Sequence, residues 1–242
     1  MEFNNLGIKK ASADRAISIT RAFEGASFSA VSGNFDGGIF SVGILQWNVK
    51  SGTLLQLLAE SYKKNPQRFM NIFGTRFSEV LIAAEKMNKG FFEAIAADPA
   101  ERRRFTSMLS LWGTAFSELQ MECAYRLVRA AHEICLSYEL KSEVALCWAY
   151  DIVVQNGSMG KAKTEAKRAV DKLRKEKAGE RKILEEMTQI RGKYVLSRWR
   201  EDYLSRKLTI VRLRGEVHGK KYDLAKEFGL SYTPYMEERR PS

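Results

Sequence analysis

Residues 143–155 read Glu-Val-Ala-Leu-Cys-Trp-Ala-Tyr-Asp-Ile-Val-Val-Gln, and this run is almost wholly apolar. A helix on the protein surface shows a polar face at a period of about 3.6 residues, and this run has none. It therefore predicts a helix that is buried on all sides and lies at the centre of the fold. Asp151 stands in the middle of the run, where a carboxylate is costly unless a cation pairs with it.

Helical periodicity recurs over most of the remaining chain. Ser12 can cap a helix that ends at Glu24, and we expect further helices over 53–62, 79–87, about 100–136 and about 194–214. Residues 25–48 differ, because Ser, Gly and Asn are frequent and apolar residues alternate. This segment predicts a loop with a small β-hairpin around 31–47. The expected fold class is mainly α (α+β).

The composition limits the kinds of site that the chain can form. It has 242 residues, of which 45% are hydrophobic, so it can bury a core of domain size. Three cysteines do not make a disulfide framework, and two histidines disfavour a multi-histidine metal site or a Cys-His zinc site. We expect no metal and no organic cofactor. No apolar run reaches the roughly 18 residues that span a bilayer, so we expect no membrane insertion.

The charge of the chain indicates a polyanionic partner. Forty Lys and Arg against 29 Asp and Glu give a formal net charge of +11. Residues 159–193 concentrate this excess, with twelve basic against six acidic residues. The stretch predicts a helical, mostly solvated segment whose basic face meets an anionic surface. A dedicated nucleic-acid arm is the weaker interpretation, and we do not expect nucleic acid as the partner.

Two carboxylates in unlike surroundings indicate acid/base chemistry. Glu24 ends a helix beside Phe23, where apolar neighbours would favour its protonated form. Asp36 follows on a polar turn flanked by glycine, where it would stay ionised. Glycoside hydrolysis needs such a pair, an acid for the leaving oxygen and a base or nucleophile opposite it. The spacing alone is not specific, because a glutamate at a helix end often precedes a glycine-rich turn.

Motifs in three parts of the chain carry a family resemblance. Residues 36–44, Asp-Gly-Gly-Ile-Phe-Ser-Val-Gly-Ile, are similar to the pattern Asp-Gly-Arg-Gly-Tyr-Thr-x-Gly-Ile, and residues 41–47 to Ser-x-Gly-x-x-Gln-Trp. Residues 149–157 resemble a buried Tyr-Asp-x-Ile-Val-x-x-Gly helix, and residues 203–206 resemble Phe-Leu-x-x-Arg. On these motifs, which span most of the chain, the protein resembles the lysozyme-like superfamily. The closest resemblance is to its chitosanase-like branch, glycoside hydrolase family 46, and to related peptidoglycan-hydrolysing domains of phages and bacterial toxins.

The resemblance implies a fold and three catalytic roles. The fold is a two-lobed helical one with the hairpin lining the cleft, as a single catalytic domain over residues 1–242. Glu24 would be the general acid, Asp36 the base that activates water, and Ser41 the hydroxyl that helps to hold this water. The chain departs from the family pattern in three ways: Gly38 replaces an arginine, Ser41 replaces a threonine, and the Glu-to-Asp interval is shorter. A mechanism with one carboxylate, as in lytic transglycosylases, therefore stays open.

The resemblance also implies supporting residues. In an ion-pair network, Asp151 would pair with Arg191 and Arg206 and so hold an arginine near Glu24. The alternative is a buried ion pair that only anchors the helix. Candidate contacts to sugars are Gln46, Trp47, Gln155 and Asn156. A core position is the alternative for Trp47, and helix capping or packing is the alternative for Gln155 and Asn156.

Charge distinguishes between the polymers that such an enzyme could cleave. Chitosan is a polycation that a basic protein repels, whereas peptidoglycan carries carboxylates and Gram-positive walls add teichoic phosphates. We therefore expect a muramidase that cleaves β-1,4 bonds of peptidoglycan strands by acid/base catalysis, with inversion. Residues 1–20 carry charges where a signal peptide needs an apolar segment, so we expect synthesis in the cytoplasm and action on the cell wall or periplasm after release or secretion. A phage endolysin or a secreted antibacterial effector fits this, with delivery machinery or an immunity protein as further partners.

Alternatives from other classes remain at this point. Among enzymes, they are a chitosanase and a lytic transglycosylase. Outside enzymes, the alternative is a basic helical module that docks on nucleic acid or on phage structural proteins.

Overall fold

The structure, a computed structural model, describes residues 6–33 and 38–237, so that Asp36 lies outside the described residues. The chain divides into two compact units. We call Met1–Phe23 together with Ala124–Ser242 the terminal unit, and Glu24–Cys123 the inserted unit. The chain is mainly helical with small antiparallel sheets, which confirms the predicted fold class. That both units form a single catalytic domain stays a prediction.

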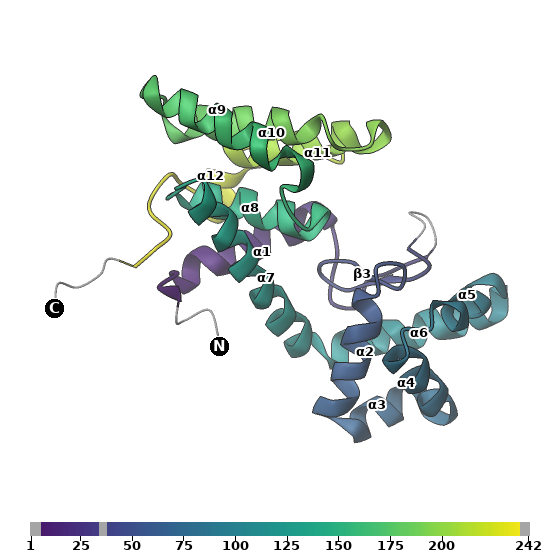
Figure 1. Ribbon diagram of the computed structural model, residues 1–242. Coiled ribbons are helices and arrows are strands. Elements are labelled where there is room, and N and C mark those ends of the chain that lie inside the picture. The colour runs from purple at the N-terminus through teal and green to yellow at the C-terminus, as the bar shows by residue number, and fades with distance from the viewer. Residues whose placement is uncertain (1–5, 34–37, 238–242) are drawn as a thin grey trace. The chain divides into compact units, whose positions relative to one another are not determined.

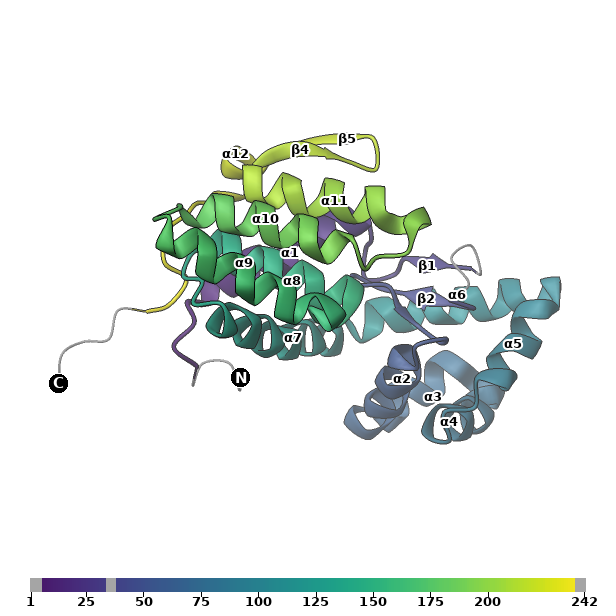
Figure 2. The same cartoon turned by 45° about the horizontal axis from the view of Figure 1, so that its top comes forward.

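The sheet of the inserted unit consists of two-residue strands, β1 (Val31–Ser32), β2 (Ser41–Val42) and β3 (Trp47–Asn48). The strands are antiparallel in the order β1-β2-β3, and Val42 of the middle strand lies opposite both Val31 and Trp47. Figure 2 shows β1 and β2, and Figure 1 labels β3. The hairpin expected around 31–47 is therefore present, with one strand more than predicted.

Phenylalanine rings form the core of the inserted unit. The ring centroid of Phe105 lies 5.4 Å from Phe40, 6.0 Å from Phe73 and 5.8 Å from Phe92. These rings join the sheet region to the helices α3 (Pro66–Phe73), α5 (Lys89–Ala97) and α6 (Pro99–Ala115). The unit also contains α2 (Thr53–Lys64), α4 (Phe77–Glu85) and the 3-10 turn η3 (Gly74–Arg76). Burial of these apolar faces is the main force that holds such short helices in place.

Two of these helices, α3 and α5, were not predicted. Both are short, so their periodicity is weak, but each begins at an asparagine that caps its first turn. The Asn65 side chain accepts a hydrogen bond from the backbone N–H of Arg68, and the Asn88 side chain accepts one from Phe91. The asparagine caps, with Pro66 at the first position of α3, are the sequence signals that could have revealed these helices.

The helical stretch expected over about 100–136 is present but is divided into two helices, because α6 ends at Ala115 and α7 (Ser117–Ser137) begins after Phe116. Phe116 leaves helical geometry, with φ −112° and ψ 31°. Near this break, a side chain on Gly113 would come within 2.1 Å of the carbonyl oxygen of Phe28. The end of α6 therefore packs closely against the 25–30 loop, and helical periodicity alone does not predict such a contact.

In the terminal unit, α8 (Glu143–Asn156) is the buried helix that the sequence predicts. Every residue from Glu143 to Val153 is buried. It is covered by α1 (Lys10–Glu24), α7, α10 (Glu180–Gly192) and α11 (Ser197–Arg212), as Figure 2 shows. The polar atoms of its rings are paired, since Trp148 Nε1 donates to Thr188 Oγ1 at 2.8 Å and the Tyr150 hydroxyl to the Ala124 carbonyl at 3.0 Å.

The basic segment 159–193 forms the 3-10 turn η4 (Gly160–Ala162), α9 (Lys163–Lys175) and α10. In α9 only Ala166, Val170 and Leu173 are buried, which is one narrow apolar stripe. Most of its basic side chains are exposed, as expected for a solvated basic helix.

The tail from Gly215 onward contains most of a second hairpin. Strands β4 (Arg214–Val217) and β5 (Lys220–Asp223) pair antiparallel and are followed by α12 (Leu224–Phe228). In this region Tyr222 and Leu224 are buried and Phe228 is half-buried, so that these side chains anchor the tail. No helix in the described part of the chain combines the length and apolar character that crossing a membrane requires.

Candidate active site

Glu24, the proposed acid, is the last residue of α1 and is half-buried. The turn that precedes it is held firmly by groups of the terminal unit. The Tyr222 hydroxyl donates to the Ala22 carbonyl at 2.8 Å, and its ring packs edge-on against Phe23 with centroids 5.1 Å apart. The guanidinium carbon of Arg206 lies 5.5 Å from the centre of the Phe23 ring. The end of α1 is therefore held in place by several contacts, and the catalytic roles of Glu24 and Asp36 stay predictions.

Asp151 is fully buried in α8 and is paired with two cations of α11. Arg206 forms a two-point contact, with Nη2 at 2.6 Å from Oδ1 and Nε at 3.2 Å from Oδ2, and the Lys207 ammonium contacts Oδ2. Burial by itself raises the pKa of the Asp151 carboxyl, but Arg206 and Lys207 together outweigh burial and hold this pKa below its usual range. Asp151 is therefore ionised at neutral pH.

Arg206 was predicted as a partner of Asp151, and the structure brings the two together. Arg191 was also predicted, but Lys207 takes the place of the second cation. Arg191 Nε instead donates to the Ser158 carbonyl at 3.3 Å, and its guanidinium carbon lies 6.0 Å from the centre of the Tyr203 ring. The ion-pair network predicted from Asp151, Arg191 and Arg206 is thus corrected to Asp151, Arg206 and Lys207.

Lys207 carries a signal that sequence reasoning missed. Tyr203, Arg206, Lys207 and Ile210 are spaced as one face of a helix, and all four are buried. A lysine on a buried helix face needs an anionic partner, and Asp151 is the buried carboxylate for which the sequence analysis expected a cationic partner. Burial lowers the pKa of Lys207 to about 8, against the attraction of Asp151, which raises it.

The two candidate sugar contacts at the end of α8 differ in their surroundings. Gln155 bridges two charged groups, since its Oε1 accepts from Lys207 Nζ at 2.6 Å and its Nε2 donates to Asp202 Oδ2 at 3.0 Å. It is therefore a link in a polar network. The Oδ1 atom of Asn156 is buried and has no hydrogen-bond partner among the described residues. Asn156 therefore retains an acceptor for a ligand or for water.

In the inserted unit, Gln46 and Trp47 are placed by the sheet. Gln46 has a φ of 52°; its Nε2 donates to the Gly43 carbonyl at 2.9 Å and its Oε1 accepts from Ser32 Oγ at 2.8 Å. Its amide thus supports the turn between β2 and β3. Trp47 is only 7% exposed, which favours the core position over stacking on a sugar.

Ser41 and Gly43 belong to the motif that carried the resemblance. Ser41 is fully buried on β2, and its hydroxyl has no hydrogen-bond partner among the described residues. Gly43 has a φ of 81°, and a side chain there would lie 2.0 Å from Gln120 Oε1. Gln120 in turn donates from Nε2 to the carbonyls of Gly113 and Phe28, at 2.8 and 3.1 Å. Gly43 is therefore required for packing, whereas Ser41 retains an unused polar atom.

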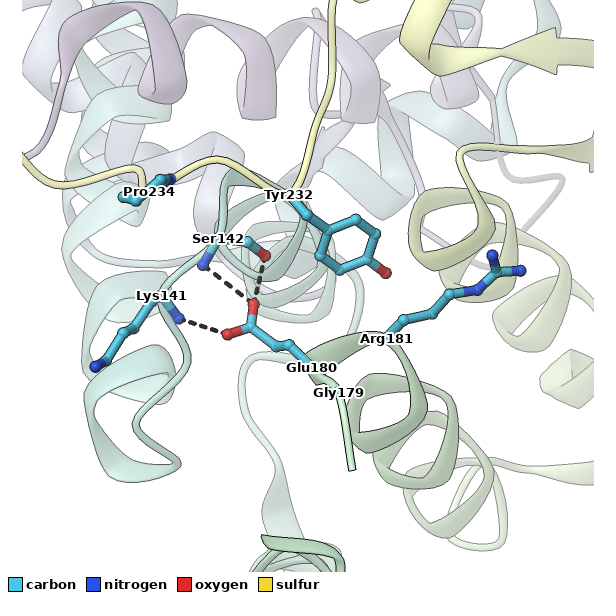
Figure 3. Close-up of a pocket in the computed structure, with 7 residues that line it drawn as sticks. All are labelled: Lys141, Ser142, Gly179, Glu180, Arg181, Tyr232 and Pro234. Atoms are coloured by element: carbon cyan, nitrogen blue, oxygen red, sulfur yellow. Dashed lines mark hydrogen bonds between the residues drawn. The ribbon is translucent and has the colours of Figure 1, made fainter. Parts of the chain in front are cut away.

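Two cavities of the terminal unit contain none of the predicted site residues. One, of about 360 Å³, is lined by Lys141, Ser142, Gly179, Glu180, Arg181, Tyr232 and Pro234 (Figure 3). The Glu180 carboxylate in this cavity is already hydrogen-bonded within the protein. It accepts hydrogen bonds from the backbone N–H groups of Lys141 and Ser142 and from the Ser142 hydroxyl. The other, of about 330 Å³, lies beside Tyr138 and residues 157–160. Among the described residues, no group of three or more His, Cys, Asp or Glu is placed to hold a metal ion.

Comparisons with known proteins give matches in structure only. No family model and no curated protein matches the sequence. A chitosanase of Bacillus subtilis MY002, with a glutamate replaced by alanine and in complex with six GlcN units, superposes with a TM-score of 0.64 at 17% identity, over 90% of this chain and 98% of that chain. A family 46 chitosanase of Gynuella sunshinyii in complex with chitotetraose gives a TM-score of 0.55 at 15% identity, over 89% and 98% of the two chains.

The native Bacillus subtilis MY002 chitosanase also matches, with a TM-score of 0.53 at 16% identity, over 90% of this chain and 98% of that chain. The three structures share one fold, and each is spanned almost completely. The chain therefore has the chitosanase-like form of the lysozyme-like fold, which confirms the fold that its motifs predict.

Proposed function

We propose that the protein is a glycoside hydrolase that cleaves β-1,4 bonds in a polymer of amino sugars. The observation that carries this proposal is the chitosanase-like fold over 90% of the chain, with Glu24 at the end of α1, where the family resemblance puts the general acid. The buried Asp151–Arg206 pair supports it, because Arg206 also packs on Phe23, the residue before Glu24.

The proposed mechanism uses two carboxylates. Glu24 protonates the oxygen of the leaving sugar, and Asp36 removes a proton from the water that attacks the anomeric carbon. Ser41 helps to hold this water through its hydroxyl. Because water attacks from the face opposite the leaving group, the product has the inverted configuration.

Peptidoglycan is the substrate that we propose, on grounds of charge. The net charge of +11 attracts a polymer with lactyl and peptide carboxylates and repels the polycation chitosan. The exposed basic side chains of α9 extend this attraction along one helix. We therefore propose a muramidase that acts on the cell wall after release or secretion, as an endolysin or an antibacterial effector.

Mass spectrometry of digested peptidoglycan tests the proposal. The wild-type protein should release fragments with reducing muramic ends, and Glu24→Gln should release almost none, because an amide cannot donate the proton. Glu93→Gln, which changes an exposed glutamate of α5, is the matched control and should act like the wild type. Anhydro ends would instead identify a lytic transglycosylase.

Two parallel assays separate the remaining alternatives. Digestion of chitosan but not of peptidoglycan would identify a chitosanase. No glycan cleavage together with a shift of DNA on a gel would favour the non-catalytic basic module.

A further inference from the structure

His218 occupies an unusual position in the β4–β5 hairpin. His218 and Gly219 form its two-residue turn, with φ of 51° and 77°. Positive φ at both positions is the type I′ geometry, which asparagine and glycine adopt readily and other residues adopt at a cost. A histidine that keeps this backbone conformation suggests that its side chain is needed where it lies.

The imidazole of His218 joins two other elements of the terminal unit. Its Nδ1 lies 3.0 Å from the carbonyl oxygen of Phe23 in α1, and its Nε2 lies 2.6 Å from Asp202 Oδ1 in α11. The side chain is 54% exposed, so it sits at the surface end of the network that contains Asp151.

Both partners of this imidazole are hydrogen-bond acceptors. A backbone carbonyl has no proton to donate, and an ionised carboxylate has none either. A neutral imidazole donates through only one nitrogen, whereas the imidazolium donates through both. The ring therefore stands between the end of α1 and Asp202, and with a proton on Nδ1 it donates to the Phe23 carbonyl.

The network that starts at His218 returns to the same residue of α1. Asp202 Oδ2 accepts from Gln155, Gln155 accepts from Lys207, and Lys207 pairs with Asp151. Asp151 pairs with Arg206, which packs on the ring of Phe23. His218 thus contacts the carbonyl of Phe23, while Arg206, at the other end of the network, packs on the ring of Phe23.

We infer that His218 is a positioning residue for Glu24. The inference rests on the proposed function, because it assigns His218 to the acid of that reaction. The carbonyl of Phe23 and the N–H of Glu24 belong to one rigid peptide plane. A hydrogen bond to that carbonyl therefore restrains the peptide group to which the Glu24 Cα is bonded, and so limits how far Glu24 can shift. Loss of this hydrogen bond would misplace the acid without removing it.

Nitrogen NMR of the imidazole tests the hydrogen bond to Phe23 without reference to activity. In protein labelled with ¹⁵N at its two histidines, the His218 signals, assigned by their loss in His218→Asn, should show a proton on Nδ1, the nitrogen that faces the Phe23 carbonyl. A ring without a proton on Nδ1 cannot donate to that carbonyl and would overturn the inference.

Kinetics on peptidoglycan fragments test the positioning role. Asparagine tolerates positive φ but is too short to reach both partners, so His218→Asn should keep the hairpin and the melting temperature. We expect kcat to fall about 10-fold to 100-fold with little change in KM, since a misplaced acid slows the chemical step rather than binding. Asp202→Asn should give a similar loss, and the double variant should lose no more than the worse single one.

Lys221→Gln is the matched control, because Lys221 is an exposed residue of the same hairpin. It should behave like the wild type. An active wild type with an unchanged His218→Asn variant would overturn the inference alone. A rise in KM with constant kcat would overturn it too, because it would assign His218 to substrate binding. An inactive wild type would overturn both the inference and the proposed function.

Discussion

Ser41 is fully buried on β2, and its hydroxyl has no hydrogen-bond partner among the described residues. A buried hydroxyl without a hydrogen bond lowers the stability of the folded protein, so replacing it by a methyl group should not destabilise the fold. We expect Ser41→Ala to keep or slightly raise the melting temperature and to reduce turnover on peptidoglycan. Calorimetry and a turnover assay measure the two effects. A loss of stability with full activity would show that Ser41 is structural.

Asp36→Asn is the change that best separates the two proposed mechanisms. If Asp36 is the base, the amide cannot take a proton from water, and turnover should fall by roughly 10²–10⁴, more than in Ser41→Ala. The wild-type product should have the inverted anomeric configuration by NMR. If Asp36→Asn stays active and anhydro products appear, the one-carboxylate mechanism with Glu24 alone would replace the inverting one.

At the scale of the element, α11 supplies the cations that let α8 bury a carboxylate. Lys207 has a pKa of about 8 in the folded protein, below its ordinary value of 10.5, because of burial. Between these two pH values the unfolded state binds more protons at this site, so the contribution of Lys207 to stability rises with pH.

The unfolding free energy of the wild type minus that of Lys207→Met should therefore increase from pH 8 to 10.5, by about 3 kcal/mol at most. Denaturant unfolding at several pH values measures it. Titration of the buried cysteines and tyrosines occurs in both proteins and drops out of the difference. Lys221→Met is the exposed control, and a difference that stays flat over this range would contradict the shifted pKa.

The basic face that begins at η4 and continues along α9 is expected to bind the wall rather than the scissile bond. Glutamine substitutions at Lys161, Lys163, Lys167 and Arg168 should lower the amount pulled down by intact sacculi. Turnover on short soluble fragments should change little. The same loss of charge in the inserted unit, at the exposed residues Lys63, Lys86, Arg102 and Arg103, is the matched control. Equal effects of both sets would mean that net charge, and not α9, governs binding.

At the scale of the whole molecule, the charge of +11 should make wall binding sensitive to salt. Attraction between exposed charges is screened within about 8 Å at physiological ionic strength. Retention on sacculi should therefore fall steadily as NaCl increases, while hydrolysis of short fragments falls less. Binding that is unchanged at high salt would point to an uncharged glycan contact and away from charge as the basis for the choice of peptidoglycan.

The sequence by itself determined the features that depend on one segment at a time. The apolar run around Trp148 predicted the buried helix, because no surface helix lacks a polar face. The end of α1 at Glu24 and the solvated basic helices followed from periodicity and charge. The order of the motifs predicted the chitosanase-like fold, which the structural matches confirm.

Only the tertiary structure decided which distant side chains meet. Asp151 required a cation, but 55 residues separate it from Arg206, and nothing local chooses Lys207 over Arg191. The break between α6 and α7 lies beside the close packing of Gly113 against Phe28, a contact that hydrophobic periodicity does not register. His218 holds the end of α1 across 195 residues of sequence, because hydrogen bonding depends on distance in space.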